Sequence, residues 1–154
     1  MSRDVTDEDL QAFLAREYER LLRRRLYGLA GSFSIPTYIS LPAPAEPIVL
    51  GRLIDVLLYL RSLSAFLHRR DVRFFRFDEW SLERRPDGRV RIGAVARAVA
   101  PGGRPPVLFD AVYYVDLRGP HPKIEMIDYR AVEPAGTVQE VQSGVMDRLL
   151  ALTR

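Results

Sequence analysis

The stretch Val107–Arg130, with the sequence VLFDAVYYVDLRGPHPKIEMIDYR, indicates the fold class of this chain of 154 residues. It contains two runs of β-prone residues separated by the turn sequence RGPHP. Strands joined by so short a connection pair in an antiparallel manner. Two earlier segments, 72–85 and 89–99, also show a period of two and are followed by PDG and PGG turns. The sequence therefore predicts an antiparallel sheet of four long strands.

Alternation along the third of these strands assigns its two faces. The apolar face is expected to meet the core and carries Val107, Phe109, Ala111, Tyr113, Val115 and Leu117. The opposite face carries Leu108, Asp110, Val112, Tyr114 and Asp116. A sheet with one solvated face shows this kind of alternation, so Asp110 and Asp116 are expected to face water or a partner. Asp110 is a candidate for a cross-strand ion pair with Arg97 or Arg91.

Three segments have helical periodicity. Apolar residues spaced three and four apart predict a helix over about Thr6–Arg25. A second helix, over about Arg52–His68, is expected to be largely buried because its apolar residues cover more than one face. A third, over Thr137–Leu152, follows the last strand as a C-terminal extension, and Thr137 with Glu140 predicts a capping box at its start.

The region between the first two helices is rich in Gly and Pro, which end helices. Within it, Phe33–Leu41 is predicted as a short strand at the edge of the sheet, because an edge tolerates Pro36. A second short strand is predicted at Ile48–Leu50. The whole chain, 1–154, is expected to form a single α+β domain, with helices packed on an antiparallel sheet.

Composition excludes several classes of site. The chain has no cysteine, and therefore no disulfide, thiolate nucleophile or Cys-ligated zinc. Its two isolated histidines, His68 and His121, do not form a metal-binding pattern, so neither a metal nor a cofactor is expected. His68 is expected to bond carbonyls at a helix C-terminus.

Charge and hydropathy bear on location and partners. The net charge is +3, and the basic run Arg23–Arg25 is interpreted as the positive end of a helix rather than as a phosphate-binding patch. No stretch has the roughly 18–20 apolar residues of a membrane span. We therefore expect a cytoplasmic protein with no membrane or nucleic-acid partner.

This order of elements resembles the NTF2-like superfamily, the cystatin-like α+β cone fold that includes SnoaL-type polyketide cyclases and ketosteroid isomerases. The resemblance covers about Thr6–Pro134 and is carried by FSIPTYISLP (33–42), PIVLGRLIDVLLYL (47–60) and KIEMIDYRAV (123–132). The helix at 137–152 lies beyond the common core of that superfamily. The resemblance implies a curved sheet wrapped around the helices, a pocket for a small molecule inside the cone and a homodimer formed through the convex face.

Asp128 is the main candidate for chemistry inside such a cone. If Ile124 and Met126 face inward, alternation points Asp128 inward as well. A buried carboxylate has a raised pKa and can act as a general base. The alternative is a structural ion pair with Arg130 or Arg76.

Tyrosine and the other aromatic residues supply the remaining candidates. In sites like that of ketosteroid isomerase, a tyrosine and a protonated aspartic acid bind the oxyanion, and Tyr113 with Asp128 is the nearest equivalent here. Asp78 shares a face with Trp80 unless a bulge intervenes. The expected pocket-lining residues are Tyr38, Trp80, Phe109 and Tyr129.

These residues support three functional hypotheses. The favoured one is a domain that binds a small apolar or aromatic ligand in the cone. The first alternative is a cofactor-independent isomerase, cyclase or dehydratase that uses Asp128 and Tyr113. The second is a protein-interaction or dimerisation module that uses the C-terminal helix and the convex sheet face.

Overall fold

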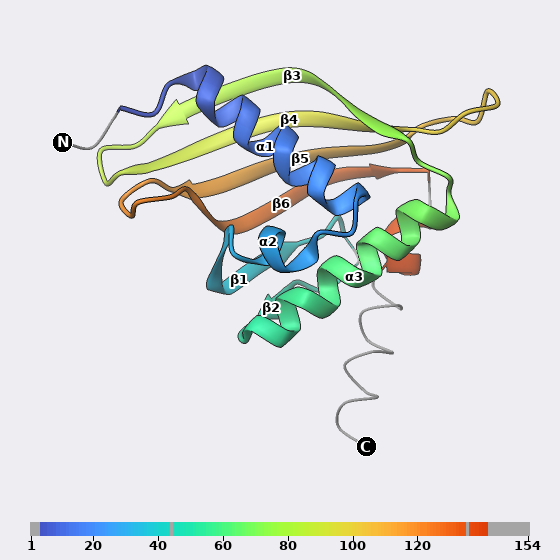
Figure 1. The fold of residues 1–154 in the computed structure, drawn as a ribbon, viewed down its shortest axis with the longest axis horizontal. Coiled ribbons are helices and arrows are strands. Elements are labelled where there is room, and N and C mark those ends of the chain that lie inside the picture. The colour runs from blue at the N-terminus through green and yellow to red at the C-terminus, as the bar shows by residue number, and fades with distance from the viewer. Residues whose placement is uncertain (1–3, 44, 135, 142–154) are drawn as a thin grey trace.

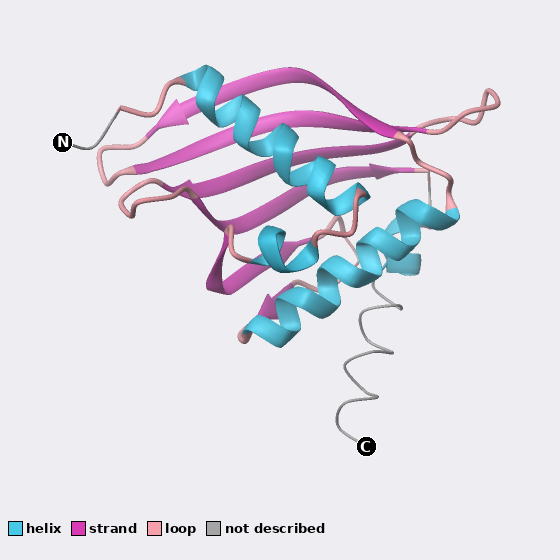
Figure 2. Ribbon diagram, in the orientation of Figure 1, coloured by secondary structure: helices cyan, strands magenta, loops and turns pink. Residues whose placement is uncertain are grey.

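The computed structural model describes residues 4–43, 45–134 and 136–141 and shows helices on one side of a curved sheet (Figures 1 and 2). The helices are α1 (Asp7–Leu22), α2 (Leu26–Ala30) and α3 (Leu53–Arg69). The strands are β1 (Phe33–Ser40), β2 (Ile48–Leu50), β3 (Phe74–Arg84), β4 (Arg89–Val99), β5 (Val107–Asp116) and β6 (Lys123–Glu133). Their order in the sheet is β2-β1-β6-β5-β4-β3. The predicted α+β architecture is confirmed.

The two long helices lie where periodicity predicts them. Thr6 caps α1, because its side chain accepts a hydrogen bond from the backbone of Asp9 and the Asp9 carboxylate accepts one from the backbone of Thr6. The short helix α2 was not predicted, because it lies in the Gly- and Pro-rich region and contains Gly28. Its other residues include Leu29 and Ala30, which are both buried, so packing outweighs the weak helix propensity of one glycine.

The placement of β1 differs from the prediction. This strand is not an edge, because it pairs with β2 on one side and runs parallel to β6 on the other. Its register with β6 shifts between Phe33 and Tyr38, so Pro36 lies where the ladder is already interrupted. A proline, which has no N–H to donate, is tolerated at such a bulge. The edge next to β1 is formed by β2.

The inner face of the sheet and the apolar sides of α1 and α3 form one core. On β5 the predicted inner residues from Val107 to Val115 are buried, and this confirms the assignment of its two faces. The largest fully buried side chains include Leu10, Leu14, Val56, Phe66, Leu67, Ile92 and Tyr113. Within the described residues, no helix is both long and apolar enough to cross a membrane.

The chain continues after β6 into a helical segment at 137–141, and the rest of the predicted helix to Leu152 lies outside the described residues. The predicted capping box is wrong, because Thr137 is the first helical residue and not the residue before the helix. Its hydroxyl donates to the carbonyl of Pro134 at 2.7 Å. The Glu140 carboxylate instead accepts hydrogen bonds from Arg70 at 3.1 Å and Arg69 at 3.4 Å, and these join the segment to the end of α3.

Charged side chains on the outer face pair differently from the prediction. Arg97 does not pair with Asp110, because its Nε donates to Oδ2 of Asp78 at 2.8 Å. Arg91 lies 3.9 Å from the carboxylate of Glu83. Both arginines therefore reach β3, where alternation also brings carboxylates to the outer face.

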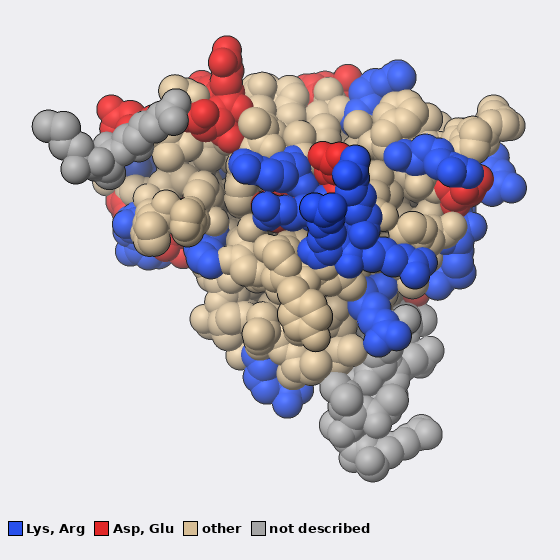
Figure 3. Space-filling model, in the orientation of Figure 1, with Lys and Arg blue, Asp and Glu red and all other residues tan. Residues whose placement is uncertain are grey.

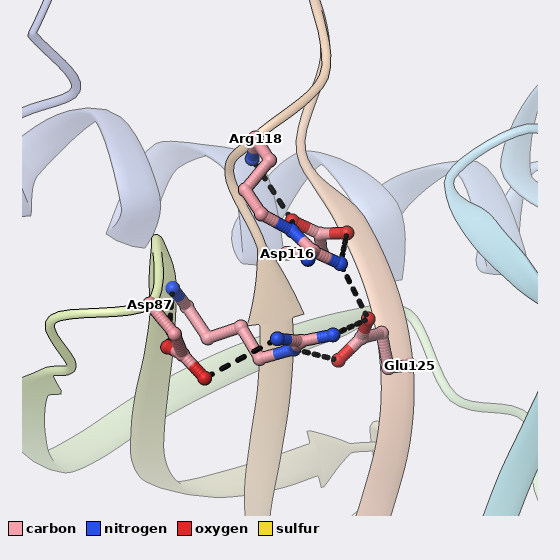
Figure 4. A network of polar contacts seen from close by, with 5 residues as sticks. Asp87, Asp116, Arg118 and Glu125 are labelled. Carbon is pink, nitrogen blue, oxygen red and sulfur yellow. Dashed lines mark hydrogen bonds and ion pairs between the residues drawn. The ribbon is translucent and has the colours of Figure 1, made fainter.

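A network of charges joins the ends of β4, β5 and β6 (Figure 4). Arg89 donates to Glu125 at 2.9 Å and contacts Asp87 at 3.2 Å. Arg118 bonds Asp116 at 3.0 Å and lies 4.0 Å from Glu125. Hydrogen bonding from Arg118 lowers the pKa of Asp116 to about 2. Asp116 therefore has a solvated, ion-paired role, as alternation predicted.

The turn between β3 and β4 requires glycine at Gly88, whose φ is +81°. A Cβ there would also lie 2.7 Å from Cγ of Arg118. We expect Gly88→Ala to lower the free energy of unfolding by about 1–2 kcal/mol, because an L-residue is strained in the left-handed region. Urea denaturation measures the change.

The matched control is Gly28→Ala in α2, where an added Cβ meets nothing within 4 Å. This variant is expected to be neutral or to stabilise the protein by up to about 1 kcal/mol, because alanine favours helix more than glycine does. Equal effects of the two substitutions would contradict a left-handed turn at Gly88.

Candidate functional site

Four tyrosine side chains meet inside the cone. Tyr18 comes from α1, Tyr59 from α3, Tyr113 from β5 and Tyr129 from β6, and all four are buried. The hydroxyl of Tyr18 bonds that of Tyr113, and the hydroxyl of Tyr59 lies 3.1 Å from that of Tyr129. Each pair joins a helix to the sheet.

Regular periodicity brings three of these tyrosines to the core. Tyr18 lies in the apolar stripe of α1, and Tyr59 lies on the buried side of α3. Tyr113 belongs to the inner face of β5 by simple alternation. Tyr18 and Tyr59 were not predicted as site residues, although a buried tyrosine usually requires a partner for its hydroxyl.

Two small cavities lie beside this tyrosine cluster. The first has a volume of about 20 Å³ and includes Leu41, Ile48, Leu63, Phe109, Val132, Val138 and Val141 in its wall. The second has a volume of about 30 Å³, and its wall includes Glu17 and all four tyrosines. Tyr59, Leu63 and Tyr129 line both cavities, so the two are neighbours separated by the Tyr59–Tyr129 pair.

Burial keeps the four phenols protonated. Desolvation raises the pKa of Tyr18, Tyr59 and Tyr113 well above the usual phenol range, and it raises the pKa of Tyr129 to about 12. The proximity of the other phenols adds to the rise for the first three. The cluster therefore presents hydroxyl donors and acceptors, not phenolates, at neutral pH.

Glu17 is a buried acidic residue of this site that was not predicted from the sequence. Its side chain is only 5% exposed, and Arg20 donates to its Oε1 at 3.2 Å. Burial raises the pKa of Glu17, while a hydrogen bond with the Ser32 side chain and the positive charge of Arg20 partly offset the rise. Its Oε2 is buried without a hydrogen-bond partner among the described residues. Helical spacing could have indicated that Glu17 is buried, because it lies in the apolar stripe that contains Leu10, Leu14 and Leu21.

The predicted pair of Asp128 and Tyr113 is not brought together. The register between β5 and β6 shifts at Glu125, so Ile124 pairs with Val115 but Met126 pairs with Tyr114. The extra residue reverses the alternation that follows. Asp128 therefore pairs with Val112, on the outer face, while Tyr113 faces the core.

The predicted pocket residues fall into two groups. Phe109 lines the first inner cavity, and Tyr129 lines both. Trp80 stacks on Phe77, with ring centroids 5.4 Å apart, and does not line either cavity. Tyr38 is 48% exposed and borders a groove on the outer face.

A bulge also separates Asp78 from Trp80. The register between β3 and β4 shifts between Asp78 and Ser81, and Glu79 has a φ of +56°. Asp78 consequently stays on the outer face, where Arg97 bonds it. Trp80 turns inward and extends an aromatic row over Phe77.

Basic residues gather on the helical face of the molecule, where α1 and α3 lie side by side (Figure 3). Arg23 caps the C-terminus of α1 and pairs with Glu19 at 2.9 Å, in agreement with its interpretation as the end of a helix. His68 Nε2 donates to the carbonyl of Leu22, the last residue of α1, at 3.0 Å. Residues 4–43, 45–134 and 136–141 contain no group of three or more potential metal ligands.

The raised pKa of Glu17 predicts a pH dependence of stability. As pH rises, the unfolded chain releases this proton before the folded chain does, so Glu17 lowers the stability progressively above the ordinary carboxyl range. We expect Glu17→Gln to raise the Tm relative to the unsubstituted protein, and to raise it more at pH 8 than at pH 5. Thermal unfolding across this range measures the difference.

Glu19→Gln is the control for this prediction, because Glu19 lies two residues away in α1 and its side chain is 58% exposed. Its effect on Tm is expected to be small. If both variants changed Tm in parallel at every pH, a raised pKa at Glu17 would be ruled out.

A scan against protein-family models and a search of curated proteins gave no match. Solved structures do resemble this one. The beta subunit of benzoate 1,2-dioxygenase from Burkholderia mallei is 14% identical, with a TM-score of 0.61 over 85% of this chain and 93% of that one. A variant of a protein named Rd1NTF2_05 is 15% identical, with a TM-score of 0.57 over 80% and 99% of the two chains.

A third similar structure is that of SalBIII, described as an epoxide hydrolase/cyclase-like enzyme in pyran ring formation in polyether salinomycin. It is 18% identical, with a TM-score of 0.51 over 80% of this chain and 92% of that one. Identities this low establish a shared fold and no more. The fold of this chain is that of the NTF2-like superfamily.

Proposed function

We propose that this chain binds a small, mainly apolar molecule inside the cone, between α1, α3 and the inner face of the sheet. The observation that carries the proposal is the pair of neighbouring cavities with apolar walls, which lie beside a buried cluster of four tyrosines. Binding sites for small molecules have this composition, in which apolar surface supplies affinity and a few polar groups fix orientation. The shared fold adds no specific ligand, because one fold hosts many functions.

The size of the cavities limits how a ligand can enter. Volumes of about 20 and 30 Å³ are each sufficient for about one water molecule. A larger ligand requires the two cavities to join, and Tyr59 and Tyr129 are the side chains that separate them.

The helical segment at 137–141 forms the outer wall of the first cavity, through Thr137, Val138 and Val141. Its ion pairs from Glu140 to Arg69 and Arg70 are more than a third exposed at both partners. Exposed pairs of this kind contribute about 0–1 kcal/mol each. Moving this segment outward would therefore break only weak polar contacts while it enlarges the cavity.

Val138→Trp tests this site by filling the first cavity from its wall. We expect at least one of three probes, toluene, benzyl alcohol and indole, to raise the Tm of the unsubstituted protein, because a ligand that binds only the folded state stabilises it. The same probe is expected to have no effect on Val138→Trp. Differential scanning fluorimetry measures both results.

Gln139→Trp is the matched control, because Gln139 is exposed and lies in the same helical segment. It should respond to the probe as the unsubstituted protein does. The proposal fails if no probe shifts Tm and native mass spectrometry of the purified protein finds no retained small molecule.

A second candidate function is homodimerisation through the convex face, away from the helices. Tyr38 on β1 and Val49 on β2 are 48% and 58% exposed. A groove of about 570 Å³ beside them is lined by Tyr38, Tyr114 and Met126, among others. Exposed apolar side chains gathered on one face are typical of a protein–protein contact.

Tyr38→Glu should disrupt such a dimer, because it places a charge in an apolar contact. We expect light scattering to give a dimer mass for the unsubstituted protein and a monomer mass for the variant. Tyr27→Glu is the control, because Tyr27 is 83% exposed on α2, on the helical side of the sheet. A monomeric unsubstituted protein at about 100 µM, far above a typical Kd for a stable complex, would exclude the dimer.

A further inference from the structure

A third space lies outside the cone, between α1 and β3, the strand at one end of the sheet. It is an open groove of about 420 Å³, and its wall presents polar as well as apolar surface. Sites for small molecules have volumes of about 300–1,000 Å³ and combine apolar walls with a few polar groups. The wall includes Glu19 and Arg23 at the end of α1, and Arg73, Phe74, Phe75 and Phe77 at the start of β3.

The groove exists because the two ends of α1 are held by different partners. At the start of α1, the carboxylate of Asp7 accepts a hydrogen bond at 2.9 Å from Arg84, the last residue of β3. At the end of α1, the carbonyl of Leu22 bonds His68 of α3 at 3.0 Å. The helix therefore crosses the sheet obliquely, near the end of β3 and away from its beginning (Figure 1).

Three phenylalanines form the apolar wall of the groove. Phe75 and Phe77 pack on Tyr18, with ring centroids 4.6 and 5.2 Å away, but both remain only half-buried. Phe74 is 47% exposed. Aromatic surface left open in a groove is suited to another aromatic ring, which gains from offset-stacked or edge-to-face contact.

Two arginines line the same groove, one from each wall. Arg23 pairs with Glu19 at 2.9 Å, and Arg73 pairs with Asp71 at 3.1 Å. All four side chains are at least half exposed, so these ion pairs contribute little and another anion can take the place of the carboxylates. A guanidinium binds a carboxylate or phosphate through two parallel hydrogen bonds.

The surroundings of the groove also favour an anion. Basic side chains gather over α1 and α3 on this side of the molecule (Figure 3). Among them, Arg24, Arg25 and Arg61 form no salt bridge with another residue in the described part of the chain. Clustered charge of one sign raises the local concentration of ligands of the opposite sign.

We propose that this groove binds an aromatic molecule that carries one carboxylate or phosphate group. The anionic group lies between Arg23 and Arg73, and the aromatic ring lies against Phe74, Phe75 and Phe77. The groove shares none of its described lining residues with the two cavities inside the cone. The proposal is therefore independent of the function proposed for the cone.

Four probes of nearly equal size test the class of ligand. 2-Naphthoate is anionic, 2-naphthalenemethanol is neutral, 2-naphthylmethylamine is cationic at neutral pH, and decahydro-2-naphthoate is anionic but saturated. We expect NMR titration to show 2-naphthoate binding at least about tenfold more tightly than the neutral and cationic probes, because hydrogen bonds between charged partners are the strong ones. It should also bind more tightly than its saturated analogue. The backbone signals that shift should be those of Arg73, Phe74 and Phe75, and not those of Tyr59 and Tyr129.

Variants of the charged residues test the position of the anion. Arg73→Gln should weaken 2-naphthoate binding about tenfold and leave 2-naphthalenemethanol unaffected, because it removes one of the two cations. Glu19→Gln should strengthen 2-naphthoate binding, because it removes the carboxylate that competes for Arg23. Arg104→Gln is the control, because it removes the same charge from an exposed position between β4 and β5.

Each contrary outcome overturns a defined part of the proposal. Equal binding of 2-naphthoate and 2-naphthalenemethanol would contradict the anionic group, and equal binding of the saturated analogue would contradict the aromatic ring. Equal losses in Arg73→Gln and Arg104→Gln would mean attraction by overall charge rather than a site. Shifts at Tyr59 and Tyr129 would place the probe inside the cone, and no binding of 2-naphthoate at millimolar concentration would exclude the groove as a site.

Discussion

A phenol buried away from water needs a hydrogen-bond partner, and this requirement ties the helices of the chain to its sheet. Tyr18 reaches from α1 to Tyr113 on β5, and Tyr59 reaches from α3 to Tyr129 on β6. Shape alone would let the apolar sides of the helices slide over the inner face, because the hydrophobic effect is not directional. The two hydroxyl pairs define a position for each helix, and this position creates the small cavities between them.

Much of this arrangement follows from sequence periodicity. The faces to which the residues of β6 point do not follow from it. On β5 the alternation is unbroken, and the burial of Tyr113 could be predicted from it. On β6 an extra residue at Glu125 reverses the faces, which places Tyr129 inside and Asp128 outside. Glu125 accepts a hydrogen bond from Arg89 on β4, a residue far away in the sequence. A strand pattern read by itself contains no signal of that kind.

The acidic residue of the site shows a different limit of prediction. Alternation along the strands predicted a carboxylate inside the cone at Asp128. Glu17 instead lies on α1, among charged residues of which most are exposed. Its position within the apolar stripe distinguishes it from Glu19, because helical geometry directs residue 17 to the core and residue 19 to solvent. A charge within an apolar stripe is therefore the informative feature in such a sequence.

The cone is nearly filled, but buried polar groups make up part of its filling. Apolar side chains alone would pack there without unsatisfied polar groups, and such a core is usually at least as stable as one that contains a buried charge. This chain instead places one carboxylate and four phenols around a space the size of a water molecule. Oε2 of Glu17 is buried there with no direct hydrogen-bond partner among the described residues. This polar interior lowers the free energy of unfolding relative to a wholly apolar core of the same shape.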